Sequence, residues 1–516
     1  MMSKSGNYFK LTMTIVVIGT ITTIIYLIMY TFILFYYDYN MIDRLFSFLL
    51  FPSILFFAAN SLEYSLCVFR ENFYCVNKSK ETHSVDPISP KVAVFIMDFN
   101  EDRVTLERTI SSCTQMSYRN RVIYLLDDST NDELMISAQD IAERYEIEYL
   151  HRDNRIGYKA GAINEALRKV KAKYVLLLDA DQRPYHNILS EVVPMLEEDP
   201  KLAFVQTPQF YSNHATNRVA GAAFANQASF FNYICEGKSR VNAIFTSGTN
   251  VVIRVSALQD IGGFDEESVT EDLSTSFDLH KNGYSSYYHN HILAEGNGPL
   301  DFPGFKKQQM RWAYGGIRVL RKVVWSFIKY RSSLTITQWQ EYFLTSTWYF
   351  IGLATFLLML SPVAFLLFDI HSLSMKQQGS YLIGYLLYLT FSYLQLFTTL
   401  KLRGVKTSEI LWGLNISFIA FPTYMKAAFY ALIGKELPFV VTPKTSSGRA
   451  SIKEFLPQIA MMIVMAFTVA VGIIKIWDHT SISLVINTLW SLYCLTMLQG
   501  IWYFMPVGRR DVSAHQ

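Results

Sequence analysis

Long runs of apolar residues lie at both ends of the chain and frame a middle region in which polar and apolar positions alternate. Each run is free of charged residues, and nearly all are long enough to cross a bilayer as a helix. The runs therefore predict about six membrane spans, at residues 11–37, 45–62, 342–368, 380–400, 456–474 and 480–508.

Six spans would place both ends of the chain and the middle region on one side of the membrane. The positive-inside rule identifies that side as cytoplasmic, because the basic residues that border the runs fall there. These residues are Lys4, Lys10, Arg70, Lys401, Arg403, Lys406, Lys444, Arg449, Arg509 and Arg510. We therefore expect a multi-pass protein of the plasma membrane, with contacts to the lipid bilayer and a cytoplasmic middle region.

Two further segments favour amphipathic helices that lie in the membrane interface. The first, 317–330, has an apolar face opposite lysines and arginines, formed by Ile317, Leu320, Val324, Phe327 and Ile328. The second, 410–425, is apolar but interrupted by Pro422. Its composition predicts a helix that lies on the bilayer or dips into it.

These patterns divide the chain into membrane and cytoplasmic parts. The predicted order is two membrane helices (1–68), a cytoplasmic domain (69–312), an interfacial helix (313–340), two membrane helices (341–401), a second interfacial helix (402–436), a loop (437–453), and two membrane helices with a short cytoplasmic tail (454–516).

The middle region alternates short apolar strand patterns with helix patterns. Strands are predicted at 92–97, 122–126, 146–150, 174–178 and 251–254, and helices at 104–115, at 133–145, and from Tyr158. This β-α-β alternation predicts an α/β domain with a parallel, doubly wound sheet. Ligands of such sheets bind at the carboxyl ends of the strands.

Composition narrows the class of protein. Hydrophobic residues make up 51% of the chain and charged residues 17%, which is too apolar for an ordinary soluble enzyme. The net charge of +3 is too balanced to indicate nucleic acid as a partner. The five cysteines form no Cys-x-x-Cys pair, which favours reduced, structural thiols.

The strand at 174–178 is followed at once by two carboxylates, Asp179 and Asp181. Two carboxylates at a strand end suit a hard divalent cation, Mg²⁺ or Mn²⁺, that also carries phosphate oxygens. An Asp-x-Asp sequence also occurs in ordinary turns, so the pair alone leaves both interpretations open.

Two common nucleotide sites are excluded by their motifs. No Gly-x-Gly-x-x-Gly follows the first strand, and no Gly-x-x-x-x-Gly-Lys-Ser/Thr is present. An acidic strand edge with Lys159 nearby instead suits a nucleotide sugar, whose base and ribose meet carboxylates and whose diphosphate meets a metal ion.

Two motifs follow later in the domain. Thr270-Glu271-Asp272 heads a helix pattern, and capping by Thr270 with acids in the first turn would also explain it. Gln308-x-x-Arg311-Trp312 precedes the first interfacial segment, where Trp312 could also be a membrane anchor.

Together these residues resemble the membrane-integrated family-2 glycosyltransferases, which include cellulose, chitin and hyaluronan synthases. The ordered motifs that carry the resemblance are Asp127-Asp128, Asp179-Ala180-Asp181, Thr270-Glu271-Asp272 and Gln308-x-x-Arg311-Trp312. Each motif alone is weak, but the ordered set between two blocks of spans is specific. The resemblance covers roughly residues 92–449 and implies a GT-A-like domain inserted between membrane helices.

The resemblance also implies roles for single residues. The nucleotide sugar would be held by Phe99, Glu101, Asp127, Lys159, Asp179, Gln308 and Arg311. Asp181 would bind the metal ion with support from Asp179, and Asp272 would be the catalytic base. The acceptor sugar would meet Trp312, Glu271 and Gly248.

A further match lies at residues 439–444, which resemble the gating loop of bacterial cellulose synthases. Phe439, Thr442 and Lys444 would be its functional residues, and a plain linker is the other interpretation. Ser129 and Phe99 depart from the usual cellulose synthase residues, Gly and Tyr, which leaves the sugar donor open.

The resemblance favours a processive, inverting enzyme that elongates a β-linked polysaccharide from UDP-glucose and moves it across the membrane, with room for accessory secretion subunits. Mannan, glucomannan or chitin synthesis and non-processive glycosylation of a membrane lipid are alternatives. A transporter with a regulatory domain is disfavoured by the four motifs.

Overall fold

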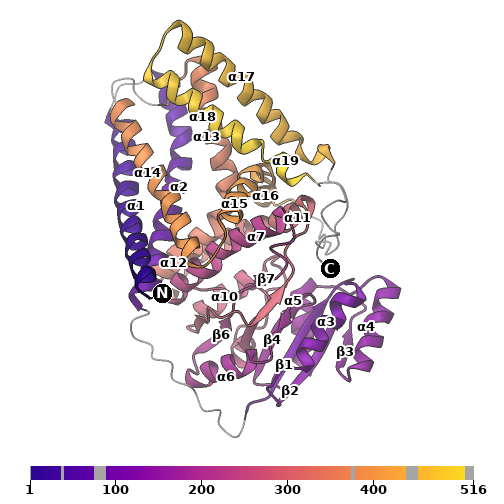
Figure 1. Cartoon of the computed structure of the whole chain (residues 1–516). Helices are drawn as coiled ribbons and strands as arrows, with labels where there is room; N and C mark the ends of the chain where they lie inside the picture. The colour runs from indigo at the N-terminus through magenta and orange to yellow at the C-terminus, as the bar shows by residue number, and fades with distance from the viewer. Residues whose placement is uncertain (1, 37–39, 75–88, 373–377, 437–450, 506–516) are drawn as a thin grey trace.

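The computed structural model divides the chain into an α/β domain and a bundle of long helices that stands on one side of it (Figure 1). It describes residues 2–36, 40–74, 89–372, 378–436 and 451–505. Within the described residues, six helical segments are long and apolar enough to span a membrane, as the sequence predicts. They are Tyr8–Phe35, Met41–Glu71, Ile336–Phe368, Leu382–Leu402, Ile452–Asp478 and Ile482–Phe504.

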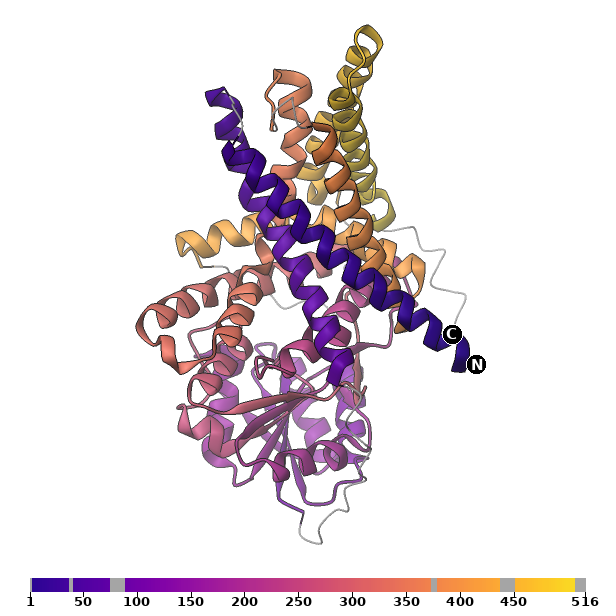
Figure 2. The ribbon, with the colours of Figure 1, turned by 90° about the vertical axis from the view of Figure 1, so that its left-hand side faces the viewer.

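These segments belong to helices that flank the α/β domain in sequence. The helices are α1 (Met2–Tyr36), α2 (Met41–Tyr74), α12 (Ile336–Thr347), α13 (Ile351–Phe368), α14 (Gln378–Leu402), α17 (Leu456–Asp478) and α18 (Ile482–Leu498). α1 begins at the level where the bundle meets the α/β domain, and the helices extend away from that domain (Figure 2).

A bent pair of helices lies where the second interfacial segment is predicted. α15 (Thr407–Ile419) and α16 (Phe421–Ile433) meet at an angle of 47°. Pro422 stands in the first turn of α16, where its missing N–H is tolerated. The pair counts as a seventh candidate span only if its two arms cross the bilayer as one.

The α/β domain is built on a sheet of seven strands in the order β3-β2-β1-β4-β8-β6-β9. The strands are β1 (Val92–Asp98), β2 (Arg121–Asp127), β3 (Glu148–His151), β4 (Tyr174–Asp179), β6 (Leu202–Gln206), β8 (Val251–Arg254) and β9 (Ser285–Tyr288). The first four strands along the chain run parallel, as predicted. β8 runs antiparallel to β4 and to β6, so the sheet is mixed rather than parallel throughout.

Alternate residues of the central strands enter two cores. On one face of the sheet, Ile96 and Leu176 pack with Ile110 of α3. On the other face, Phe95 and Leu177 pack with residues of the helices that cover that side. Burial on both faces explains why these strands read as continuous apolar runs. The helices around the sheet are α3 (Arg103–Thr114), α4 (Asp132–Arg144), α5 (Tyr158–Lys169), α6 (Ile188–Glu198), α9 (Val255–Asp260) and α10 (Glu271–Lys281).

A second, three-stranded sheet and a long helix join the α/β domain to the membrane helices. The small sheet has the order β5-β10-β7, with β5 (Arg183–Pro184), β7 (Phe210–Tyr211) and β10 (Ala294–Gly296). The helix α11 (Phe302–Lys329) is continuous, and Ile317 packs with Tyr424 and Ala427 of α16. The remaining helical segments at the boundary are α7 (Arg218–Ser229), η2 (Phe230–Ile234) and α8 (Cys235–Ser239).

The apolar face predicted for residues 317–330 is divided in the structure. Ile317 is buried, and Leu320 and Phe327 are partly buried. Val324 and Ile328 are exposed, beside an exposed Trp325. The buried side of α11 is completed instead by Val319 and Val323, because α10 and α12 pack on it from a second direction.

Candidate active site

The strand register brings the predicted carboxylates to one edge of the main sheet. Asp98 and Asp127 are partners at the ends of β1 and β2, and Asp179 at the end of β4 lies beside Met97. The carboxylates gather there because the three strands are parallel and end at nearly the same level.

A cavity of about 1220 Å³ opens at this edge and is lined by nearly all of the predicted site residues. The predicted residues that line it are Phe99, Glu101, Lys159, Asp179, Asp181, Gly248, Glu271, Asp272, Gln308, Arg311 and Trp312. They come from well-separated stretches of the chain, so the fold joins the motifs into one site. Phe439, Thr442 and Lys444 lie outside the described residues.

Asp127 is brought to the same sheet edge but is not among the residues that line the cavity. Its carboxylate is fully buried and accepts hydrogen bonds from the Tyr149 hydroxyl at 2.7 Å and the Ser129 N–H at 2.8 Å. Asp128, the second acid of the motif, does line the cavity. In this structure Asp127 therefore organises the strand end and its hydrogen bonds.

Asp128 forms a buried ion pair with Arg152. The arginine Nε and Nη2 approach the two carboxylate oxygens at 2.8 and 2.5 Å. The same guanidinium donates to the carbonyls of Ile156 and Tyr158. This bidentate pair fixes the loop that leads into α5, and with it the start of the helix that carries Lys159.

Lys159 stands at the centre of the cavity's charged groups. Its Nζ lies 2.5 Å from Asp179 Oδ1 and donates to the Gly248 carbonyl at 3.0 Å. Burial opposes protonation of this amine, but Asp179, Glu271 and Asp272 outweigh it and raise the pKa of Lys159. The lysine is therefore a buried, fully charged cation at neutral pH.

Gly248 permits the close approach of these groups. Its φ of +76° is a conformation that favours glycine, and a Cβ there would lie 3.3 Å from Asp272 Oδ2 and 3.4 Å from Lys159 Nζ. Next to it, Thr249 Oγ1 accepts the Asp179 N–H at 2.9 Å. The loop after Phe245 thus fixes the end of β4 while leaving room above it.

Glu271 and Asp272 begin α10 and face the cavity. The side chain of Thr270 makes no capping hydrogen bond, so the alternative of a simple helix cap is not what the structure shows. Burial, and then repulsion from Asp272, raises the pKa of Glu271 to about 7. Burial also raises the pKa of Asp272, although the Leu273 N–H, Lys159 and Arg311 counteract it.

Asp179 and Asp181 offer the oxygen ligands that Mg²⁺ and Mn²⁺ prefer. The Asp179 side chain is 39% exposed, whereas the Asp181 residue is only 8% exposed, and both line the cavity. Among the described residues, no third His, Cys, Asp or Glu donor joins them within 4.8 Å. A metal ion held here would need phosphate oxygens or water to complete its coordination.

Gln308, Arg311 and Trp312 reach the cavity from α11. The Gln308 amide donates to the Tyr211 hydroxyl at 3.2 Å, and Gln227 donates to the same hydroxyl at 2.7 Å. These bonds tie the motif to the small sheet and to α7. Trp312 lines the site itself rather than serving only as an anchor in the bilayer.

Sequence reasoning misses the role of Arg155. Its guanidinium lies 3.7 Å from the centre of the Phe99 ring, and both residues line the cavity. A cation over an aromatic face makes a flat, partly polar surface that suits a nucleobase. The loop with two arginines before α5 is the available signal, because it follows directly from the third strand.

The fold is GT-A-like. The structure superimposes on that of mannosyltransferase PcManGT from Pyrobaculum calidifontis, in complex with GDP-Man and Mn²⁺, with a TM-score of 0.53 and 17% sequence identity. The alignment covers 75% of this chain and 100% of that one. Residues 90–315 match the family model described as "Glycosyltransferase like family 2", and this part of the chain is a family-2 glycosyltransferase domain, a class of enzyme that uses nucleotide sugars.

Several named relatives are similar to this chain in sequence. A cellulose synthase catalytic protein of Dictyostelium discoideum is 41% identical over 33% of this chain and 16% of its own length. The cellulose synthase catalytic subunit of Pseudomonas fluorescens is 26% identical over 79% and 55%, respectively. Glucomannan 4-beta-mannosyltransferase 7 of Arabidopsis thaliana is 30% identical over 51% and 48%.

The chain spans about half or less of the length of these relatives. The six candidate spans and the membrane-bound relatives make it a multi-pass membrane protein with a family-2 glycosyltransferase domain.

Proposed function

We propose that this protein is a processive, inverting glycosyltransferase that elongates a β-linked polysaccharide and passes it across the plasma membrane. One observation carries the proposal. A single cavity is lined both by the acidic edge of the sheet, with Asp179, Asp181 and Asp272, and by residues of the membrane helices. A growing polymer needs such a continuous path, whereas a single transfer to a lipid does not.

The membrane part of the cavity has a lining that suits a sugar chain. Aromatic and small polar side chains alternate there, namely Trp348, Phe56, Asn60, Ser61 and Tyr64 of α2, Tyr388, Ser392 and Gln395 of α14, and Ser417 of α15. Aromatic faces pack on the C–H surfaces of a sugar, and hydroxyl and amide groups exchange hydrogen bonds with its hydroxyls. The charged domain then lies on the cytoplasmic side, where nucleotide sugars are made.

The reaction is a displacement at the anomeric carbon. An acceptor hydroxyl forms the new bond, the bond to the nucleoside diphosphate breaks, and the hydroxyl proton passes to Asp272. Lys159 and Arg311 offset the negative charge that develops on the leaving diphosphate. Asp181 and Asp179 would hold Mg²⁺ or Mn²⁺, which supplies further positive charge to the diphosphate. Trp312 orients the acceptor against this centre.

We favour UDP-glucose as the donor and a β-glucan as the product. The relatives named as cellulose synthases support this choice. A glucomannan or mannan product is the second candidate, because a plant relative is named a glucomannan 4-beta-mannosyltransferase. Chitin-type synthesis and lipid glycosylation remain further alternatives, and accessory secretion subunits would fit a secreted polymer.

The test is turnover of the purified full chain, in lipid nanodiscs, against a panel of nucleotide sugars. We expect a long polymer from UDP-glucose that a β-glucanase degrades. A product degraded only by a mannanase, or formed only from GDP-mannose, would establish the second candidate. A product of one sugar on a lipid would overturn the processive function.

A further inference from the structure

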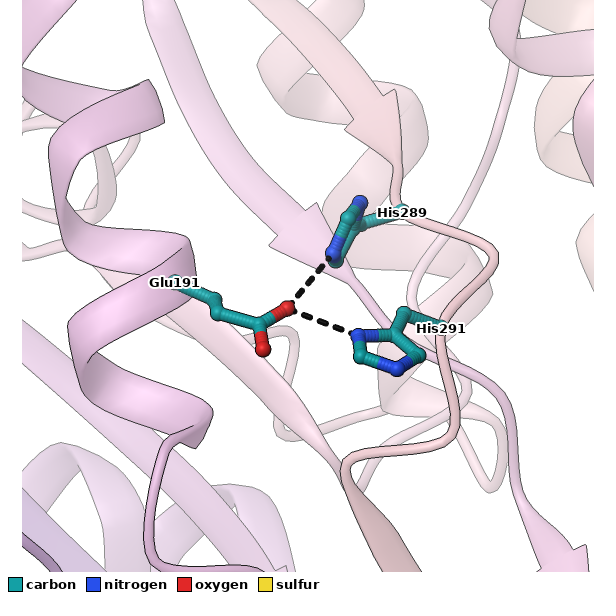
Figure 3. A group of neighbouring side chains, drawn as sticks. All are labelled: Glu191, His289 and His291. Atoms are coloured by element: carbon teal, nitrogen blue, oxygen red, sulfur yellow. Dashed lines mark hydrogen bonds and ion pairs between the residues drawn. The ribbon is translucent and has the colours of Figure 1, made fainter. Parts of the chain in front are cut away.

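Three metal-ligating side chains converge on the surface of the α/β domain, outside the cavity described above. Glu191 comes from α6, and His289 and His291 follow β9 (Figure 3). None of the three lines the active-site cavity. Of the described residues, these alone bring three His, Cys, Asp or Glu donor atoms within 4.8 Å of one another.

The three donor atoms already approximate one face of a metal-coordination tetrahedron. Glu191 Oε2 lies 3.2 Å from His289 Nε2 and 2.7 Å from His291 Nδ1. Zinc ligands at about 2.0–2.2 Å from the ion stand about 3.3–3.5 Å apart in a tetrahedron. A Zn²⁺ ion therefore fits between them after movements of less than about 1 Å at two of the three edges.

A neighbouring residue orients the carboxylate. The Asn187 side-chain amide donates to the other oxygen, Glu191 Oε1, at 2.5 Å. This bond turns Oε2 toward both imidazoles, in the way that outer hydrogen bonds orient metal ligands in known sites. Without a metal ion, the two imidazole N–H groups donate to one oxygen, and both nitrogens must give up those protons when they ligate a metal ion.

The ligands join two segments that also pair in the small sheet. β5 pairs antiparallel with β10, with Pro184 opposite Ala294 and Arg183 opposite Glu295. At one end of this pair the chain passes into Asp181 and Gln182, which line the active-site cavity. At the other end the Tyr185 N–H donates to the Leu293 carbonyl, just before the segments that carry Glu191 and His291.

We propose that Glu191, His289 and His291 form a structural zinc site that braces the β5–β10 pair from the end opposite the active site. Two imidazoles and one carboxylate make a donor set that favours Zn²⁺ over Mg²⁺, which prefers oxygen ligands. A water molecule would complete the tetrahedron, because His291 is exposed. This site is chemically distinct from the oxygen-only pair at Asp179 and Asp181.

The test is Zn²⁺ binding to the purified full chain after chelator treatment, in a buffer with excess Mg²⁺. We expect saturable binding of one Zn²⁺ per chain. X-ray absorption should show two imidazole nitrogens at about 2.0 Å. Saturation should raise the melting temperature by about 2–4 °C.

Two variants and one control make the outcome decisive. His291→Ala, at a side chain that is 56% exposed, and Glu191→Gln should each weaken Zn²⁺ binding by at least about 100-fold and abolish the thermal shift. His479→Ala, which removes an exposed imidazole at the end of α17, should bind like the wild type. Absence of one-per-chain binding in the wild type, or unchanged binding in both variants, would overturn the proposal.

Discussion

Lys159 and Asp179 form an ion pair inside the cavity, with Nζ 2.5 Å from Oδ1. The pair is formed in the absence of a nucleotide, so a diphosphate that enters must compete with Asp179 for the lysine. A second carboxylate, Asp181, lies two residues further along the same strand end. The cation is thus held where a diphosphate and its metal ion would meet.

The first prediction concerns this cation. Lys159→Gln should raise the dissociation constant for the nucleotide sugar roughly 10- to 100-fold, because a charge-assisted hydrogen bond to the diphosphate is lost. The measurement is calorimetric donor binding. Lys169→Gln, an exposed lysine on the same helix, is the matched control and should bind normally. Normal donor binding by Lys159→Gln would remove the lysine from the site.

The second prediction concerns the base. Asp272→Asn should lower the transfer rate by about 10²- to 10⁴-fold and leave donor affinity nearly intact, because it keeps the shape and removes the proton acceptor. Radiolabelled polymer yield and donor binding are measured in parallel. Asp260→Asn, at the exposed end of α9, serves as the control. Near-normal synthesis by Asp272→Asn would leave that residue a purely structural role.

The third prediction concerns the divalent ion. EDTA should stop synthesis, and Mg²⁺ or Mn²⁺ should restore it, because Asp179 and Asp181 supply hard oxygen ligands beside the expected diphosphate. Asp181→Ala should weaken both metal and donor binding, which electron paramagnetic resonance of Mn²⁺ can follow. Full activity in excess chelator would contradict the assignment of these carboxylates.

The fourth prediction concerns pH and stability. Burial, and then the adjacent Asp127, raises the pKa of Asp98 from 3.8 to about 8. Between these values the folded protein holds a proton that the unfolded chain has lost, so this group makes stability fall as pH rises from about 4 to about 8. Asp98→Asn should remove that contribution.

The check is the melting temperature of wild type and Asp98→Asn at pH 5.5 and pH 8. The wild type should lose about 5 °C more than the variant over this range. Asp132→Asn, at an exposed acid that begins α4, should follow the wild type. Parallel declines in wild type and Asp98→Asn would show that Asp98 is ionised in the folded state.

The fifth prediction concerns a buried charge cluster between the α/β domain and the membrane helices. Lys238 Nζ lies 2.8 Å from both Glu63 of α2 and Glu341 of α12. Lys238→Met should destabilise the protein by roughly 3–5 kcal/mol, because two buried carboxylates lose their cation. Thermal melting in detergent measures the loss, with the exposed Lys329→Met as control.

Replacing the whole cluster should recover part of this loss. Lys238→Met combined with Glu63→Gln and Glu341→Gln leaves no uncompensated charge in the buried position. A triple variant as unstable as Lys238→Met alone would argue that packing, rather than charge, explains the effect.

Much of the fold follows from local patterns. The strand predicted at 251–254 has the bounds that the structure shows, and the helices predicted at 104–115 and 133–145 agree within one residue at each end. These elements carry their own signals, namely apolar runs and polar caps such as Asp102 and Asn131. The antiparallel direction of β8 carries no such signal, because a strand buried on both faces reads the same in either direction.

The site is predictable where motifs end a strand or begin a helix, as at Asp179 and Asp272. The separation of Asp127 from Asp128 is not, because only tertiary structure shows that Tyr149 covers one and Arg152 pairs with the other. The cluster of Glu191 with His289 and His291 escapes sequence reasoning for the same cause. About 100 residues separate its parts, and no spacing rule connects them.

The continuity of α11 limits how this enzyme can be studied in pieces. Its 28 residues run without a break from Phe302 to Lys329 and carry Arg311 and Trp312 in the first half. The second half packs on α12 and α16, which belong to the membrane region. A recombinant fragment cut at residue 312 would end in mid-helix and expose the surface that normally meets those helices. A soluble catalytic fragment is therefore expected to fray at its acceptor side, and kinetic work needs the intact chain in a lipid environment.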